Sequence, residues 1–250
     1  MSSFDTRRAL VIGGGSGMGR AGVESLLEAG WQVAVADIVP PDGIEGVHDI
    51  ITADLGNDGS IKAAVITAAD SLGGLDAVWN HAGLLRVGTV ETLTIEDLDR
   101  CYAINLRANV VLARMVIPIL RAAGGGSLLF TSSAAGVNLG RGVLPYTVTK
   151  TALLALMRQL ALEHAADGIR VNALCPGWVD TAFNEPAWNQ YGGRGGFIEK
   201  LPELVPLGRM ASLSEIGDLV ATLLSPTAAF ITGQSIVIDG GEGLEKGRTQ

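Results

Sequence analysis

Two kinds of hydrophobic segment alternate along the chain. Short runs rich in β-branched residues, bounded by Gly, Asp or Asn, are typical of strands buried on both faces of a parallel sheet. The predicted strands are 9–12, 32–36, 75–79, 127–131, 169–173 and 235–238, with a weaker one at 49–53. Segments with helical periodicity separate them, at 19–29, 60–72, 94–122, 146–166 and 212–224. This alternation predicts an α/β fold, a single doubly wound Rossmann-type domain over residues 1–250 with helices on both faces of a central parallel sheet.

One segment interrupts this alternation. Residues 178–210 show neither a strand nor a helix of normal length, yet they carry a glycine-rich run at 192–196 and five aromatic side chains. The rings are those of Trp178, Phe183, Trp188, Tyr191 and Phe197. Long irregular segments are usually lids or binding loops, and glycines allow a segment to hinge. We therefore expect a substrate lid at about 178–210; packing of the same rings on a neighbouring subunit is the alternative.

Composition narrows the class of protein. The 250 residues are 48% hydrophobic and 18% charged, and the formal net charge is -8. Without a basic cluster, neither a nucleic-acid surface nor a polybasic membrane patch is expected. Cys101 and Cys175 lack redox or zinc spacing and the three histidines are scattered, so we expect neither a disulfide framework nor a metal site. We see no targeting segment, and the apolar run 110–120 is short and interrupted by Arg114, which favours a soluble, cytoplasmic protein.

A glycine-rich turn joins the first predicted strand to the first predicted helix. Its sequence, GGGSGMG, runs from Gly13 to Gly19. Glycines allow a tight turn and bring backbone N–H groups close to a pyrophosphate, and the helix N-terminus favours an anion. An ordinary glycine-rich turn is the alternative, but the strand–turn–helix context favours dinucleotide binding. The candidate cofactor-binding residues of this turn are Gly13, Ser16, Gly17, Met18 and Gly19.

An acidic residue ends the second predicted strand. Asp37 stands about twenty residues after the glycines, where a carboxylate accepts hydrogen bonds from a ribose and repels a 2′-phosphate. Its expected neighbours Ser16 and Ile38 offer no positive charge, although Arg7 and Arg20 are long enough to reach in from elsewhere. The sequence therefore predicts NAD rather than NADP as the cofactor. A turn residue at a strand end is the alternative interpretation of Asp37.

The catalytic candidates lie further along the chain. Tyr146 and Lys150 are four residues apart at the start of a predicted helix, so they share one helix face. A neighbouring ammonium stabilises a phenolate and lowers the tyrosine pKa from near 10, which suits proton exchange with an alcohol or ketone. Ser132 and Ser133 close a predicted strand, where a hydroxyl can reach the ligand crevice and bind a substrate oxygen. A polar strand end that makes turn contacts is the alternative.

Taken in order, these motifs resemble the short-chain dehydrogenase/reductase family over nearly the whole chain. The matching pieces are the turn Gly13 to Gly19, Asp54-Leu55, Asn80-His81-Ala82-Gly83, Asn105, Ser133, Tyr146-x-x-x-Lys150, Pro176-Gly177-Trp178-Val179-Asp180-Thr181, Thr232-Gly233-Gln234 and Val237-Ile238-Asp239-Gly240-Gly241. No single motif carries the resemblance; their joint order does.

The resemblance implies an enzyme that transfers a hydride between NAD(H) and a secondary alcohol or ketone. It implies that Tyr146 is the general acid/base, that Lys150 lowers its pKa and binds the nicotinamide ribose, and that Ser133 holds the substrate oxygen. Asn105 would keep a water in a proton relay through Lys150. The further cofactor contacts that it implies are Asp54 at the adenine, Asn80 and Gly83 at the adenosine ribose, Val179 and Thr181 at the carboxamide and pyrophosphate side, with Leu55, Ala82, Pro176 and Gly177 in the same site.

The family pattern is not complete in this chain. Ile12 stands where the family usually has Thr, and His81 stands where it usually has a second Asn. We expect His81 to be a buried histidine with satisfied hydrogen bonds. Members are commonly tetramers through the helices predicted here at 94–122 and 146–166. The resemblance therefore implies a homo-oligomer (a tetramer or dimer) with a small-molecule substrate and no nucleic-acid or membrane partner.

Two other functions stay open. The first is an NADPH-dependent ketoreductase, which Asp37 disfavours. The second is a non-catalytic nucleotide-binding protein of the same fold. The complete set of Ser133, Tyr146, Lys150 and Asn105 argues against this second alternative. A hydrolase or kinase is not expected, because the chain has neither a nucleophile elbow nor a P-loop lysine.

Overall fold

A seven-stranded parallel sheet forms the centre of the molecule, and the computed structural model describes it within residues 6–246. The strands are β1 (Arg8–Ile12), β2 (Gln32–Asp37), β3 (Asp49–Thr52), β4 (Ala77–Asn80), β5 (Gly126–Thr131), β6 (Ile169–Pro176) and β7 (Ser235–Ile238). Their order across the sheet is β3-β2-β1-β4-β5-β6-β7. The order reverses beside β1, which confirms the doubly wound α/β fold. In such folds ligands bind outside the carboxyl ends of the strands at the point of reversal, which is here between β1 and β4.

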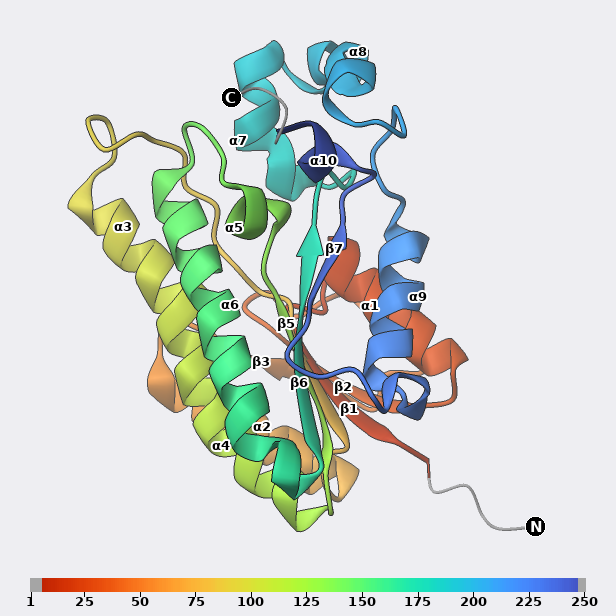
Figure 1. The fold of residues 1–250 in the computed structure, drawn as a ribbon. Helices are drawn as coiled ribbons and strands as arrows, with labels where there is room; N and C mark the ends of the chain where they lie inside the picture. Colours follow the sequence, from red (N-terminus) through yellow and green to blue (C-terminus); the bar gives the residue numbers. More distant parts are fainter. Residues whose placement is uncertain (1–5, 247–250) are drawn as a thin grey trace.

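Helices cover both faces of this sheet (Figure 1). On one face lie α1 (Gly17–Glu28) and α9 (Leu213–Leu224), and on the other lie α2 (Asp58–Leu72), α4 (Ala108–Ala122) and α6 (Leu144–His164). Side chains alternate along each strand, so in β1 Leu10 and Ile12 join the core under α2, α4 and α6, while Ala9 and Val11 join the core under α1 and α9. Strands buried on both faces explain the nearly continuous apolar runs of the sequence.

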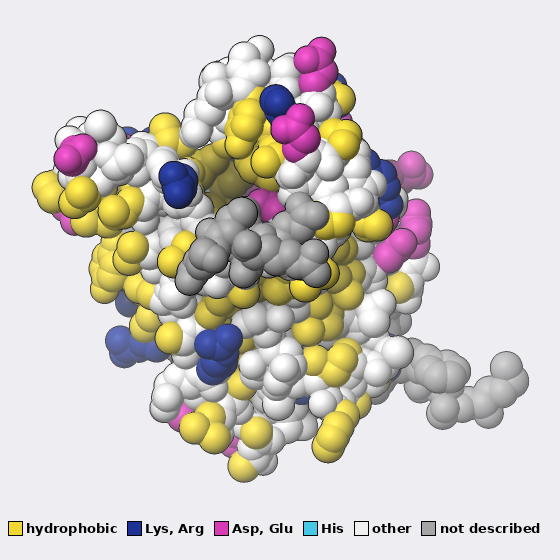
Figure 2. Space-filling view, turned by 45° about the horizontal axis from the view of Figure 1, so that its top comes forward, with side chains coloured by type: hydrophobic (Ala, Val, Ile, Leu, Met, Phe, Trp, Pro, Cys, Tyr) yellow, Lys and Arg dark blue, Asp and Glu magenta, His cyan; other side chains and the backbone are white. Residues whose placement is uncertain are grey.

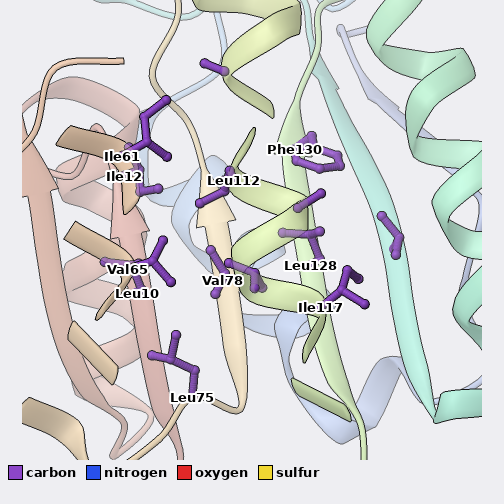
Figure 3. Close-up of a cluster of buried hydrophobic side chains, with 14 of the residues drawn as sticks. Leu10, Ile12, Ile61, Val65, Leu75, Val78, Leu112, Ile117, Leu128 and Phe130 are labelled. Carbon is purple, nitrogen blue, oxygen red and sulfur yellow. The ribbon is translucent and has the colours of Figure 1, made fainter. Parts of the chain in front are cut away.

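The larger core lies on the face that carries α6 (Figure 3). Val78, Leu112, Leu128 and Phe130 meet there with 0% of their surface exposed. Burying one such side chain contributes roughly 1.5–3 kcal/mol, so these residues hold the strand ends in place. The crevice residues described below are therefore mounted on a rigid support.

One long helix continues through a π-helical turn. Helix α3 (Ile95–Tyr102) passes through η1 (Ala103–Arg107) into α4. By length and composition alone the whole helix, Ile95–Ala122, could cross a membrane, and among the described residues it is the one helix that could. Core helices pass the same test, and α4 buries Leu112, Val116 and Leu120 completely against the sheet. We interpret it as a core helix.

Short helices gather where the strands end (Figure 1). They are α5 (Ala134–Asn138), η3 (Ala182–Asn184), α7 (Glu185–Trp188), η4 (Asn189–Tyr191), α8 (Arg194–Leu204) and α10 (Glu242–Lys246); η2 (Ala165–Asp167) and η5 (Pro226–Ala228) lie in other connections. The prediction of an irregular segment over 178–210 was therefore wrong. Helix α8 buries Phe197 and Leu201, four residues apart, but Gly192 and Gly193, with φ of 79° and 90°, interrupt the segment and Pro202 lies inside α8. Because these glycines and this proline interrupt the segment, its sequence shows no helical period of hydrophobic residues.

Candidate active site

The glycine turn lies against the end of β4. Gly13 has a φ of 82°, and a Cβ atom there would stand 2.7 Å from the Ala82 backbone nitrogen. At Gly19 a Cβ atom would overlap the Gly13 carbonyl, so helix α1 packs directly on the turn. Ser16 precedes α1 with extended backbone, and its side chain does not cap the helix. The first N–H groups of α1, which include those of Gly17 and Met18, are thus available to an anion.

Asp37 lies beside this turn. Its carboxylate accepts hydrogen bonds from the backbone N–H groups of Gly15 at 2.9 Å and Val39 at 3.3 Å. The two arginines that could have compensated a 2′-phosphate are engaged elsewhere. Arg20 pairs with Glu24 at 2.9 Å, and Arg7 stacks on the Trp31 ring. The Asp37 carboxylate is therefore held by backbone N–H groups, and both arginines have other partners.

Ser133, Tyr146 and Lys150 converge at the carboxyl end of β5. Helix α6 carries Tyr146 and Lys150 one turn apart, with 9% and 2% of their surface exposed. The Lys150 Nζ lies 5.6 Å from the centroid of the Tyr146 ring and donates a hydrogen bond of 2.7 Å to the Thr131 carbonyl. The Ser133 side chain lies close enough to Tyr146 to lower the pKa of its hydroxyl, whereas Ser132 Oγ donates to the Lys150 carbonyl and so supports the helix. Of the two serines, Ser133 is therefore the one beside the candidate catalytic tyrosine.

Burial governs the protonation of this group. It raises the pKa of Tyr146 to about 12, and the Ser133 hydrogen bond opposes this shift. It lowers the pKa of Lys150 to about 8. In the free protein, burial therefore outweighs the lowering of the tyrosine pKa that we expect from Lys150. The ammonium is turned toward a carbonyl, and desolvation of both groups outweighs their attraction.

Asn105 lies in the π-helical turn and is buried at 0% exposure. Its side chain exchanges two hydrogen bonds with the Leu84 backbone, at 2.7 and 2.9 Å, and donates to Thr149 Oγ1 at 3.1 Å. The backbone carbonyl of Asn105 accepts a hydrogen bond of 2.9 Å from Asn109 Nδ2. A Cβ atom at Gly83 would stand 3.1 Å from Lys150 Nζ and 3.3 Å from Asn105 Oδ1. The structure thus places Asn105 beside Gly83 and Lys150.

Several of the remaining candidates border the crevice and others support it. The buried Thr181 Oγ1 has no hydrogen-bond partner within the described part of the chain, and its methyl group would meet a Cβ atom at Gly17 at 3.4 Å. Val179 is fully buried, and Pro176 ends β6 with Gly177 directly after it. An unpartnered hydroxyl over the glycine turn fits a nicotinamide dinucleotide, whose carboxamide and pyrophosphate supply the missing partners.

The adenosine-side candidates divide in the same way. Asp54 is exposed and accepts from the Gly56 N–H at 2.8 Å, while Leu55 is 7% exposed and belongs to the core. Asn80 donates to Asn109 Oδ1 at 2.8 Å, and its own Oδ1 has no partner among residues 6–246. Asp54 can therefore contact a ligand directly, whereas Leu55 and Asn80 act mainly by holding the loop ends.

The aromatic side chains of 178–210 do two different things. Phe197 lies at the centre of a buried cluster, with ring centroids 4.4 Å from Trp178, 6.3 Å from Trp188 and 5.3 Å from Tyr191. Phe183 instead lies 6.2 Å from the Tyr146 ring and is 39% exposed. Figure 2 shows a hollow beneath the segment with α7 and α8, and hydrophobic side chains line its visible part. Phe183 is therefore the ring of this segment that borders the candidate catalytic tyrosine.

Comparison with known proteins agrees with this geometry. A family model described as enoyl-(acyl carrier protein) reductase matches residues 13–242. The chain is 32% identical to cyclohexanol dehydrogenase of Acinetobacter sp. (strain SE19), with 96% of each chain covered. It is 33% identical to D-threitol dehydrogenase of Mycolicibacterium smegmatis, over 95% of this chain and 93% of the relative. The chain belongs to the short-chain dehydrogenase/reductase family. Among solved structures, Thermoplasma acidophilum aldohexose dehydrogenase superposes with a TM-score of 0.89 at 26% identity, covering 96% of this chain and 94% of that one.

This short-chain dehydrogenase/reductase also uses residues that the sequence did not single out. Thr131 supplies the carbonyl that holds Lys150, and Thr149 holds Asn105 in turn. Thr131 ends a predicted strand next to Ser132, so its position pointed to the crevice. Nothing in the local sequence showed that its carbonyl, rather than its side chain, would face Lys150.

Proposed function

We propose that this oxidoreductase transfers a hydride between NAD(H) and an uncharged secondary alcohol or ketone, with Tyr146 as the general acid/base. The observation that carries the proposal is the convergence of Ser133, Tyr146 and Lys150 beside an uncapped helix N-terminus and the unpartnered Thr181 hydroxyl. This arrangement supports a site in which a dinucleotide and a small alcohol lie side by side.

The side chains divide the chemistry between them. Ser133 Oγ holds the substrate oxygen near the Tyr146 hydroxyl. With its pKa raised to about 12, Tyr146 carries its proton at neutral pH and can donate it to a ketone oxygen, which leaves a phenolate. In the reverse direction Tyr146 first gives its proton to solvent, and the phenolate then accepts the alcohol proton. The nicotinamide, when bound, accepts or supplies the hydride. Lys150 and Asn105 hold the ribose side of the site and connect Tyr146 to solvent protons.

The cofactor preference rests on Asp37. A carboxylate fixed by two backbone N–H groups beside the glycine turn accepts hydrogen bonds from ribose hydroxyls and repels a 2′-phosphate. Because Arg20 and Arg7 are occupied by Glu24 and Trp31, neither offsets that repulsion. We infer a preference for NAD.

The substrate class rests on Phe183 and on the pairing of nearby cations. The Phe183 ring offers an apolar surface beside Tyr146. Arg194 forms an ion pair with Asp180, Lys200 pairs with Glu203 at 3.0 Å, and Arg209 pairs with Glu215 at 2.7 Å, so each of the three cations of this segment already has a carboxylate partner. A cyclic, uncharged secondary alcohol fits this site, and the similarity to cyclohexanol dehydrogenase supports the same class.

The oligomeric state and the compartment complete the proposal. Val110 on α4, Val148 and Leu162 on α6, and Val237 on β7 are each at least 41% exposed. These apolar side chains support a homo-oligomer that covers them. The two cysteines are free and buried, which supports a reducing compartment such as the cytoplasm.

The test is an assay of the purified protein for NADH formation. The panel contains cyclohexanol, a linear secondary alcohol, threitol and an aldohexose, each with NAD and with NADP. We expect the highest kcat/KM with cyclohexanol and NAD. A preference for NADP would refute the cofactor assignment, and a preference for threitol or the sugar would refute the apolar substrate class. Absence of turnover with all of them would leave the nucleotide-binding alternative.

A further inference from the structure

His81 lies between the glycine turn and the end of β5. Pairing of β4 with β5 ends at Asn80 and Phe130, so the next residues on the two strands, His81 and Thr131, are no longer joined by the backbone ladder. Their side chains join them instead, with 3.3 Å between His81 Nδ1 and Thr131 Oγ1. Trp79 Nε1 donates to the same Thr131 oxygen at 2.9 Å. Thr131 is therefore fixed by two ring nitrogens that come from the end of β4.

The Trp79 hydrogen bond has one possible direction, whereas the direction of the His81 contact depends on the tautomer of the ring. Trp79 Nε1 can only donate, so the Thr131 hydroxyl proton is free to be given to His81 Nδ1. Burial and the Lys150 charge lower the pKa of His81 to about 3, so the ring is neutral at pH 7 and can accept this proton. In that arrangement the ring hydrogen lies on Nε2; in the other tautomer Nδ1–H donates to the same Thr131 oxygen, and the contact between the two residues is kept.

Helix α1 packs directly on the same two rings. A Cβ atom at Gly22 would stand 2.2 Å from Trp79 Cζ3, and one at Gly19 would stand 3.0 Å from His81 Cδ2. The rings of Trp79 and His81 contact each other, with centroids 5.0 Å apart. Glycines at both positions let the first turns of α1 rest on this ring pair, so the helix N-terminus and the rings occupy one rigid unit.

On the other side, Thr131 contacts the catalytic machinery. The Thr131 side chain lies on the face of the sheet that carries α1, but its carbonyl accepts the 2.7 Å hydrogen bond from Lys150 on α6. One residue thus joins the two faces of the sheet. We propose that His81, acting through Thr131, is a positioning residue for Lys150, and that it couples the placement of this lysine to the first turn of α1. The inference rests on the proposed function, because it assigns the cofactor to α1 and its ribose to Lys150.

The test is a double-mutant cycle read by dinucleotide binding. His81→Phe keeps a ring against Trp79 and Gly19 but removes Nδ1, and Thr131→Val removes the hydroxyl while the carbonyl remains. Each is expected to weaken NADH binding, measured by fluorescence titration, about fivefold, the scale of one hydrogen bond. In a Lys150→Met background neither should weaken it more than about twofold, because the lysine that they position is absent. Thr131→Ser should restore wild-type affinity, and His48→Phe, at a histidine far from the site, should change nothing.

A pH profile gives a second measurement. The titratable groups near Lys150 are Tyr146 on its own helix, His81 after β4, Cys101 on α3 and Cys175 on β6. A misplaced Thr131 carbonyl stabilises the ammonium less and lowers the pKa of Lys150. The decline of NADH affinity that accompanies loss of the Lys150 proton at alkaline pH should then move to lower pH by about half a unit in both His81→Phe and Thr131→Val.

The outcomes separate this inference from the function that it rests on. Equal weakening in the wild-type and Lys150→Met backgrounds would show a merely structural role and overturn it, as would unchanged affinity with an unchanged pH profile. If the wild type binds NADPH instead of NADH, the same cycle is run with NADPH and only the cofactor assignment fails. If it binds neither, the proposed function and this inference fail together.

Discussion

Lys150 makes the stability of this protein depend on pH in a way that can be calculated from its burial. The side chain is 2% exposed, and burial lowers its pKa from the ordinary 10.5 to about 8. A difference of one in pKa corresponds to about 1.4 kcal/mol, so the buried ammonium costs the folded state about 3 kcal/mol at neutral pH. The proposed function uses this charge beside Tyr146, and the fold is less stable for carrying it.

The sign of the effect follows from proton binding. Below about pH 8 both the folded and the unfolded chain carry the proton on Lys150, so this group does not make the free energy of unfolding depend on pH. Between about 8 and 10.5 the unfolded chain still holds the proton and the folded protein has lost it. The unfolded state therefore binds more protons, and the free energy of unfolding rises with pH in this window. Lys150→Met removes this pH dependence. Between about pH 8 and 10, the free energy of unfolding of the wild type should therefore rise by about 2 to 3 kcal/mol relative to that of the variant.

Urea unfolding at fixed protein concentration, followed by tryptophan fluorescence and circular dichroism, measures this difference. Tyr146 is present in both proteins, so its own titration cancels in the comparison. Lys62→Met, at an exposed position of α2, is the matched control and should run parallel to the wild type. Parallel pH curves for the wild type and Lys150→Met would refute the assignment of a buried, partly neutral lysine.

Three further variants test the cofactor, the substrate wall and the aromatic cluster. Asp37→Ala should lower the ratio of kcat/KM with NAD to kcat/KM with NADP at least about tenfold. An unchanged ratio would mean that Asp37 does not distinguish a ribose hydroxyl from a 2′-phosphate. Phe183→Ala should raise KM for cyclohexanol about tenfold, the scale of a buried apolar contact, with KM for NAD unchanged. Phe197→Ala, at a ring with 0% exposure, should instead lower the free energy of unfolding by about 3 to 5 kcal/mol, and a selective effect on KM would contradict its structural role.

The sheet and its large helices could be predicted because both faces of the sheet are buried. That burial imposes apolar runs on β1 and β5 and a helical period on α6, and each is legible in the sequence. Segment 178–210 was misread because Gly192, Gly193 and Pro202 break the short periods of α7 and α8. In this segment the helices are stabilised by packing around Phe197 rather than by a hydrophobic period that the sequence shows.

The candidate site was predictable in its residues and not in its electrostatics. Ser133 stands at a strand end and Tyr146 and Lys150 at helical spacing, so the sequence brings these three to one place, whereas Asn105 followed from the family resemblance alone. How deeply Tyr146 and Lys150 are buried depends on contacts from distant elements, and this depth reverses the expected direction of the tyrosine pKa. The His81–Thr131 contact likewise depends on the register of β4 against β5, which no local pattern shows.

The most direct test of the proposed catalysis is the turnover of Tyr146→Phe with NAD and the best alcohol of the panel. Removing one hydroxyl leaves the ring in contact with Phe183 and Lys150, so NADH binding, measured by fluorescence titration, should stay within about threefold of the wild type. Turnover should fall at least about a hundredfold, the usual scale of lost acid/base catalysis. Turnover equal to that of the wild type, in a variant that still binds NADH, would contradict the assignment of Tyr146 as the proton-transferring residue.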